Sequence, residues 1–542
     1  MSAGYLSIIL HAHLPYVRHP GHEGELAEEW FYEAITETYI PLLNIMEDLN
    51  REGVKYRITI NLSPPLIAML ADELLQQRYQ NRLENLIELG EKELKRTEDN
   101  QEVHQLAEMY LYFLRESHYI FTKKYENNLL QGFKGLAESD SLELITSAAT
   151  HAYLPLLKTK EAVRAQINTG IKTFIHYLDR KPAGFWLPEC GQNKMVMDVL
   201  AEEGVKYIIS SSHGLLHAVP RPRYGLHAPV YTPAGVAVFG RDRESSHQVW
   251  SADEGYPGDY NYREFYRDIG HELDYDYIKP HLPGGIRKHT GFKYYKITGK
   301  TENKKIYDRI KAENKAAEHA GNFLFNRQHQ IRYLSQIMDR KPLIISPYDA
   351  ELFGHWWFEG PVWLKYFIKK TYYDQDELQL ITPGDYLKEY ETNQIAEPAE
   401  SSWGYRGYHE VWLNGSNDWI YRHLHQAESI MCEKADYYHD LTQPFSPEER
   451  CLNQMARELL LAQSSDWAFI MKTNTMVEYA VMRTRKHLHN FFRLAENISE
   501  NLNEDLLKEL ENKNNIFPFL DYRIFSQKNT AHNRAVLSGR EV

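Results

Sequence analysis

The stretch LIISPYDAELFGHWW at residues 343–357 decides the fold class of this chain. It begins with a short apolar run, Leu343–Asp349, that ends in polar and aromatic residues. Such runs are typical of strands that are covered on both faces. Six other runs follow the same plan, at Tyr5–His13, Lys55–Asn61, Glu143–His151, Gly184–Glu189, Lys206–Ser211 and Val236–Arg241. Helical patterns such as Ala162–Leu178 and Lys194–Glu203 separate most of them. This alternation predicts an α/β fold, either a parallel β/α barrel or a doubly wound sheet.

Two long stretches interrupt the alternation. Residues from Leu70 to about Gly135 are charged and helix-periodic, which predicts a helical insertion at about 70–135. Residues from Arg241 to about Gly299 are rich in Gly, Pro, Tyr and Asp, which predicts a functional loop at about 241–299. After about Thr392 the patterns become helical, at Asp418–Tyr438, Pro447–Gln463 and Trp467–Asn497. We therefore predict one barrel domain over residues 1–395, with both stretches inside it, and an α-helical C-terminal domain over residues 396–542.

The composition fits a large globular protein and disfavours several classes of partner. With 542 residues, of which 43% are hydrophobic, the chain can bury a large core. A formal net charge of −13 disfavours nucleic acid. We expect no membrane association, because no apolar run has the length of a membrane span and Tyr5–Leu10 reads as a core strand rather than a signal peptide. Three scattered cysteines, Cys190, Cys432 and Cys451, are too few for a disulfide framework, so we expect the reducing cytoplasm.

Aromatic residues are abundant, with 38 Tyr, 10 Trp and 21 Phe. Sugars present flat apolar faces beside hydroxyl edges, and aromatic rings with polar tips match both. The composition therefore favours carbohydrate binding, although large domains also bury many aromatic residues.

Four segments place titratable residues at the ends of predicted strands, where the active sites of barrel enzymes gather. They are Leu10–Tyr16, Thr150–Pro155, Gly184–Gly191 and Ser346–Trp357. Glu189 and Asp349 each end an apolar run beside aromatic residues. A retaining glycosidase needs one ionised carboxylate and one protonated carboxyl, and apolar neighbours help to keep a carboxyl protonated. Either residue could instead cap the following helix.

His11 and His13 lie two residues apart, so on a strand their side chains point the same way. Barrel metallohydrolases use this spacing for a metal site. A metal-dependent amidohydrolase or deacetylase that uses His11, His13 and Asp349 is therefore an alternative. It lacks a clear set of further ligands at strand ends.

The four segments, in this order, resemble glycoside hydrolase family 57, and within it the α-glucan branching enzymes. The resemblance rests on His13-Leu14-Pro15, His151–Pro155, Trp186-Leu187-Pro188-Glu189, Tyr348–Trp356 and Ser464-Ser465-Asp466-Trp467. It covers nearly the whole chain, and the third and fourth motifs are specific. It implies a distorted (β/α)7 barrel with a helical insertion and a helical C-terminal domain that completes the cleft. It also implies that no cofactor and no metal are needed.

The resemblance also implies roles for individual residues. Glu189 corresponds to the nucleophile and Asp349 to the acid/base of a retaining reaction. Substrate-binding positions are implied or suggested for His13, His151, Trp30, Trp250, Arg263, Trp357, Trp403, Trp412 and Asp466. The expected partner is an α-glucan such as amylose, amylopectin or glycogen, and the oligomeric state is left open. Within the same family, an α-amylase or a 4-α-glucanotransferase would share the catalytic pair and differ in the acceptor. A glucan-binding protein without activity is disfavoured by the intact pair.

Overall fold

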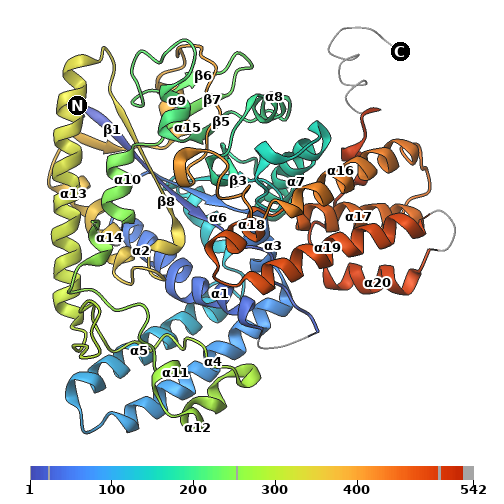
Figure 1. Ribbon diagram of the computed structural model, residues 1–542. Helices are drawn as coiled ribbons and strands as arrows, with labels where there is room; N and C mark the ends of the chain where they lie inside the picture. Colours follow the sequence, from blue (N-terminus) through green and yellow to red (C-terminus); the bar gives the residue numbers. More distant parts are fainter. Residues whose placement is uncertain (1, 22–24, 252–253, 499–501, 529–542) are drawn as a thin grey trace. The chain divides into compact units, whose positions relative to one another are not determined.

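The computed structural model describes residues 2–21, 25–251, 254–498 and 502–528 (Figure 1). The chain divides into two compact units. Unit 1 comprises Met1–Ile60, Met69–Glu143 and Arg241–Glu389. Unit 2 comprises Asn61–Ala68, Leu144–Gly240 and Tyr390–Val542. Ala252 and Asp253 of the predicted loop, and residues 529–542 of the predicted C-terminal domain, lie outside the described residues.

All seven predicted strands are confirmed. They are β1 (Gly4–Ala12), β2 (Ile58–Leu62), β3 (Leu142–Ser147), β4 (Phe185–Trp186), β5 (Tyr207–Ser210), β7 (Ala237–Gly240) and β8 (Leu343–Asp349). Two short strands were not predicted, β6 (Val230–Tyr231) and β9 (Leu378–Leu380). Both are too short to show a sequence period. Along the chain, β2 and β3 each carry residues of both units.

The sheet of unit 1 has β1 between β8 and β9, and both pairings are parallel. The register sets Tyr5 opposite Leu343 and His11 opposite Asp349. The carboxyl ends of β1 and β8 therefore meet at one edge, which carries His11, His13 and Asp349. Every residue of β1 is buried, as the continuous apolar run predicts.

Helices make up most of the rest of unit 1. They are α1 (Leu26–Ala34), α2 (Ile40–Arg51), α4 (Glu73–Arg96), α5 (Gln101–Tyr119), α6 (Leu130–Glu138), α10 (Arg243–Trp250), α11 (Ile269–Glu272), α12 (Tyr275–Ile278), α13 (Arg309–Ile337), α14 (Gly360–Tyr373) and α15 (Pro383–Glu389). The predicted helical insertion is α4, α5 and α6, and the first two pack on each other (Figure 1). A π-helical turn, η1 (Ile35–Tyr39), joins α1 to α2, and a second one, η2 (Ile120–Lys124), follows α5. Such turns are rare and often lie at functional sites.

Unit 2 contains a second run of parallel strands, in which β3 pairs with β4, β4 with β5 and β5 with β7. Strand β6 pairs with β7 antiparallel. Its helices are α7 (Lys160–Leu178), α8 (Lys194–Glu202), α9 (Ser212–Leu216), α16 (Trp419–Tyr437), α17 (Pro447–Ala462), α18 (Ser465–Thr473), α19 (Val477–Asn497) and α20 (Glu504–Lys513). The short helix α3 (Pro64–Leu70) crosses from unit 2 into unit 1.

Two sequence expectations need correction. The helical pattern over Trp467–Asn497 is two helices, because Asn474 takes the left-handed conformation (φ 60°) and ends α18. Asparagine tolerates this conformation better than most residues. The stretch at 241–299 is less irregular than expected, since it contains α10, which begins where the Asp242 side chain accepts a hydrogen bond from Ser245 N at 2.8 Å.

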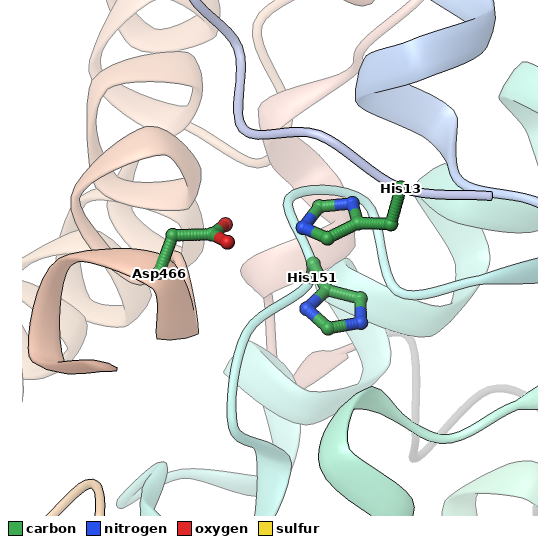
Figure 2. A group of neighbouring side chains, drawn as sticks. All are labelled: His13, His151 and Asp466. Carbon is green, nitrogen blue, oxygen red and sulfur yellow. The ribbon is translucent and has the colours of Figure 1, made fainter. Parts of the chain in front are cut away.

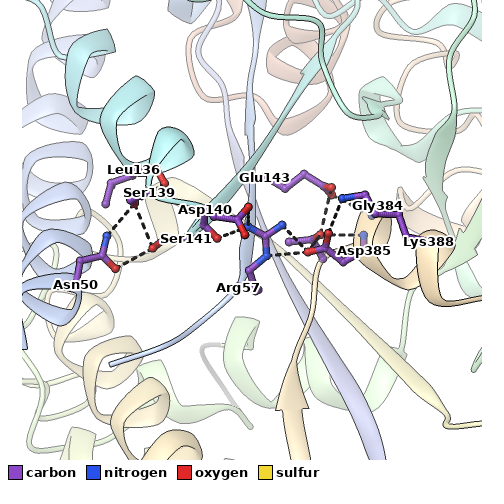
Figure 3. Close-up of polar contacts among 11 residues, drawn as sticks. Asn50, Arg57, Leu136, Ser139, Asp140, Ser141, Glu143, Gly384, Asp385 and Lys388 are labelled. Atoms are coloured by element: carbon purple, nitrogen blue, oxygen red, sulfur yellow. Dashed lines mark hydrogen bonds and ion pairs between the residues drawn. The ribbon is translucent and has the colours of Figure 1, made fainter. Parts of the chain in front are cut away.

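A network of polar side chains in unit 1 fixes the amino ends of the strands (Figure 3). Arg57, just before β2, donates from Nε to Asp385 Oδ2 at 2.7 Å and from Nη1 to Asp140 Oδ1 at 2.7 Å. Glu143 accepts from Gly384 N at 3.2 Å. The first residues of β2 and β3 are thereby tied to α15. This end lies opposite the one where Asp349 ends β8, so the network supports stability rather than chemistry. In the part of the chain that the structure describes, no helix is both long and apolar enough to cross a membrane.

Candidate active site

Asp349 is the last residue of β8 and is half-buried. Burial raises the pKa of this carboxyl to about 6, and the positive charges of Arg241 and His13 offset part of that rise. A carboxyl group with such a pKa can exchange a proton near neutral pH, as a general acid/base must. The predicted acid/base is thus in an environment suited to that role.

Glu351 is a second carboxyl group next to Asp349 that sequence reasoning did not single out. Its Oε1 accepts hydrogen bonds from the Tyr39 hydroxyl and from His13 N, the latter at 3.1 Å. Burial raises its pKa to about 8; the Tyr39 hydrogen bond opposes the rise and the charge of Asp349 adds to it. Glu351 is therefore protonated at neutral pH. The sequence offered one signal for this residue, which is that a second carboxyl group follows Asp349 by two positions.

The π-helical turn η1 packs against the loop that follows Asp349. His355 Nδ1 lies 2.8 Å from Glu37 Oε2. Burial would raise the pKa of Glu37, but the hydrogen bond from His355, with the charges of Arg263, His355 and Lys293, lowers it to about 2. A side chain at Gly354 (φ 113°) would collide with the Glu37 backbone carbonyl, so this close approach requires glycine. Tyr39 and Glu37 thus hold the acid/base loop at two points.

The other predicted substrate-binding residues of unit 1 differ in exposure. Trp250, at the end of α10, is 57% exposed, and Trp30 on α1 is half-buried. Trp357 is only 2% exposed. Arg263 is also buried, with its guanidinium carbon 4.0 Å from the centre of the Phe358 ring and its Nη2 3.9 Å from Glu37 Oε2. Trp357 and Arg263 are therefore packed side chains in this structure.

Glu189 lies in unit 2, in the turn that follows β4. Glu189 (φ 60°) and Cys190 (φ 51°) both have left-handed backbones, which side chains other than glycine rarely adopt. Such a conformation costs on the order of 1–3 kcal/mol and is commonly found at functional sites. The Cys190 side chain is buried. Glu189 therefore has a turn conformation and not the extended backbone of β4.

Hydrogen-bond donors hold both carboxylate oxygens of Glu189. Trp403 Nε1 donates to Oε2 at 2.7 Å, and Trp403 N donates to the Glu189 backbone carbonyl at 2.9 Å. The Ser465 hydroxyl donates to Oε1 at 3.4 Å. The Trp403 ring meets Trp186 edge to face, with ring centres 5.1 Å apart. Donors to a carboxylate favour its ionised form, which is the form a nucleophile needs.

His151 and Asp466 belong to the same unit as Glu189, and Figure 2 draws both side chains. His151 (φ 55°) follows β3, and its Nδ1 lies 3.0 Å from the Ser465 hydroxyl oxygen. Asp466, in the first turn of α18, accepts a hydrogen bond from the Ser464 hydroxyl at 2.6 Å. Imidazole and carboxylate groups can bind sugar hydroxyls or a metal ion. In the described part of the chain, His11, His13 and Asp349 do not form a three-residue metal-binding group.

Trp412 stacks on Tyr153, with ring centres 4.3 Å apart and an angle of 14° between the planes. The Tyr153 hydroxyl lies 2.9 Å from His409 Nδ1. Trp412 is only 1% exposed. It therefore supports Tyr153 in this structure and has no open face of its own.

Comparisons with known proteins agree on one family. The model of glycosyl hydrolase family 57 matches residues 7–399, and the model "1,4-alpha-glucan branching enzyme, C-terminal" matches residues 423–525. A 1,4-alpha-glucan branching enzyme of Thermococcus kodakarensis is 35% identical over 95% of this chain and 77% of its own length.

Two solved structures are similar to the chain along almost its whole length. The α-amylase AmyC of Thermotoga maritima has a TM-score of 0.90 and 43% identity, over 96% of this chain and 99% of that one. A branching enzyme of Pyrococcus horikoshii has a TM-score of 0.87 and 33% identity, over 97% of both chains. These matches confirm the distorted (β/α)7 barrel with a helical C-terminal region. The chain belongs to glycosyl hydrolase family 57.

Proposed function

We propose that the chain is a 1,4-α-glucan branching enzyme, which cleaves an α-1,4 bond and forms an α-1,6 branch with retention. The C-terminal family model and the relative from Thermococcus kodakarensis support the branching activity. The expected substrates are amylose, amylopectin and glycogen, and the expected pathway is glycogen biosynthesis. The three cysteines are buried and no disulfide joins them, which supports a reducing compartment such as the cytoplasm. We retain 1–395 and 396–542 as the proposed functional division of the chain.

The observation that carries the chemistry is the contrast between two carboxyl groups. Glu189 accepts hydrogen bonds on both oxygens, whereas burial raises the pKa of Asp349 to about 6. Environments that drive two carboxyl groups toward opposite protonation states assign one as nucleophile and one as acid. We therefore assign Glu189 as the nucleophile and Asp349 as the acid/base.

The proposed reaction has two steps. A Glu189 oxygen bonds to the anomeric carbon while Asp349 gives its proton to the leaving 4-oxygen, so that a glucosyl ester remains on the enzyme. Asp349 then takes a proton from the 6-hydroxyl of an acceptor chain as that oxygen displaces Glu189. For retention, the two carboxyl groups should be about 5–6 Å apart in a structure with bound glucan. A distance beyond about 9 Å would contradict retention.

We propose that the sugar subsites use His13, His151 and Asp466 for hydroxyl groups, and Trp30, Trp250 and Trp403 for ring faces. Arg263, Trp357 and Trp412 are buried, so we propose that they support neighbouring residues that contact the glucan. The 57% exposed Trp250 can cover the intermediate and exclude water.

The test is chain analysis of amylose after incubation with the enzyme. Debranching with an α-1,6-specific hydrolase should release short chains, and the variant Glu189→Gln should form none while still binding glucan. Glu88→Gln, an exposed carboxylate on α4, is the matched control and should be fully active. Near-normal branching by Glu189→Gln would refute the nucleophile assignment.

Hydrolysis is the second candidate, because the similar AmyC structure is named an α-amylase. The same pair hydrolyses the intermediate if water reaches it before an acceptor. Release of reducing ends without new α-1,6 bonds would favour hydrolysis. Loss of activity on chelation, restored by zinc, would instead support the amidohydrolase alternative.

A further inference from the structure

We infer that Ser465 is a positioning residue: its hydroxyl joins His151 to Glu189 and sets the orientation of the nucleophile. The inference rests on the proposed role of Glu189. No step of the mechanism above uses Ser465, and its place at the start of a helix suggests only a capping residue. The cap of α18 is in fact the preceding residue, Ser464, whose hydroxyl bonds to Asp466.

The backbone of Ser465 is fixed to the turn that carries His151. Ser465 N donates to the His151 carbonyl at 3.1 Å, and the neighbouring residues Ala152 and Ser464 form an antiparallel bridge. Ser465 is only 3% exposed. The position of its hydroxyl is therefore set by the backbone and not by solvent.

The direction of the hydrogen bonds follows from the chemistry of the three groups. Ser465 Oγ lies 3.0 Å from His151 Nδ1 and 3.4 Å from Glu189 Oε1. An ionised carboxylate only accepts, so the single hydroxyl proton of Ser465 goes to Glu189. Its oxygen then accepts from His151 Nδ1–H. His151 Nδ1 itself is 3.9 Å from Glu189 Oε1, too far for a direct hydrogen bond.

This relay has two consequences. It places the proton of neutral His151 on Nδ1, which leaves Nε2 as an acceptor for a sugar hydroxyl. It also gives Oε1 a fixed donor, as Trp403 gives Oε2 one. Glu189 needs such support, because its left-handed backbone does not place the carboxylate by ordinary strand geometry. A displacement of about 1 Å at a reacting group can lower the rate about 100-fold.

The experiment measures formation of the covalent intermediate with 5-fluoro-α-D-glucosyl fluoride. Glu189 displaces fluoride from the anomeric carbon, and intact mass spectrometry follows the labelled enzyme. Ser465→Ala should label about 10–100-fold more slowly than wild type, with KM for amylose changed less than about twofold. Ser465→Thr, which keeps the hydroxyl, should recover most of the rate. Thr473→Ala, at the exposed far end of α18, is the control and should label normally.

Labelling of Ser465→Ala at the wild-type rate would overturn the inference, as would a Thr variant no faster than the Ala variant. If Ser465→Ala loses its cooperative melting transition, it is not folded, and the labelling rate of Ser465→Cys is measured instead. The thiol has a similar volume to the hydroxyl but is only a weak hydrogen-bond donor. Ser465→Cys should be slow, and a wild-type rate would overturn the inference. Glu189→Gln separates the two proposals: it should not label at all. If the Glu189→Gln variant is labelled at another residue, the nucleophile assignment fails. If Glu189→Gln is not labelled but Ser465→Ala is labelled at the wild-type rate, only the role of Ser465 fails.

Discussion

Replacement of Glu351 by glutamine should stabilise the protein increasingly as pH rises. In the folded chain, burial raises the pKa of this carboxyl from 4.5 to about 8. Between these values the unfolded state releases the proton while the folded state keeps it, so the stability of the wild type falls as pH rises. Glutamine retains an oxygen that can accept from Tyr39 and from His13 N, and it has no proton to release. The variant therefore lacks this loss of stability.

The magnitude follows from the shift in pKa. Each pKa unit corresponds to about 1.4 kcal/mol. Between pH 5 and pH 8 the variant should gain about 3 kcal/mol relative to wild type, and the gain should level off once both states are ionised. This is an upper limit, because Glu351 is half-buried and solvent screens part of the effect.

Calorimetric melting at pH 5, 7 and 8 is the assay. A chain of 542 residues unfolding together has an entropy of about 1.1 kcal/mol/K. The difference in melting temperature between variant and wild type should thus grow by about 3 °C from pH 5 to pH 8, and by more if unit 1 melts alone. The other titrating groups are the same in both proteins, so their contributions to the pH dependence of the melting temperature cancel in this difference. The exposed control Glu88→Gln should show a constant difference. A constant difference for Glu351→Gln as well would refute the buried, protonated state of Glu351.

Four further predictions concern activity and stability. Because Asp349 must be protonated to act as an acid, kcat/KM should fall as pH rises through about 6. Asp349→Asn should lose nearly all turnover. If this variant keeps the wild-type dependence of kcat/KM on pH, Asp349 is not the acid/base. Trp403→Phe, which removes the donor to Glu189, should lower kcat about tenfold, while Trp403→Ala should also weaken glucan binding by about 1–2 kcal/mol in calorimetric titration. Trp250→Ala should raise reducing-end release relative to new α-1,6 bonds; an equal ratio would make the ring structural only. Arg57→Met should lower the free energy of unfolding by about 1–2 kcal/mol, because the hydrogen bonds to Asp385 are lost, and should leave the activity of the folded enzyme unchanged, since this contact lies away from the chemistry.

The sequence by itself determined the seven strands and their parallel class. Nearly continuous apolar runs such as those of β1 and β8 carry a strong local signal, because strands covered on both faces have no side that must be polar to face solvent. The helical insertion and the C-terminal helices were also predictable from their periodicity. The break at Asn474 was not predicted, since one left-handed residue changes little in a helical pattern. The candidate residues Glu189 and Asp349 were found because specific motifs surround them.

Only the tertiary structure decided what surrounds each candidate residue. Glu351 and Tyr39 are 312 positions apart in the chain, so no local pattern could pair them. Ser465 reaches Glu189 across 276 positions. The burial of Trp357 was equally hidden, because a tryptophan after a strand can face a cleft or a core with the same sequence. Hydrogen bonds and burial depend on which distant segments pack together, and it is these contacts that set the protonation and orientation of the two carboxyl groups.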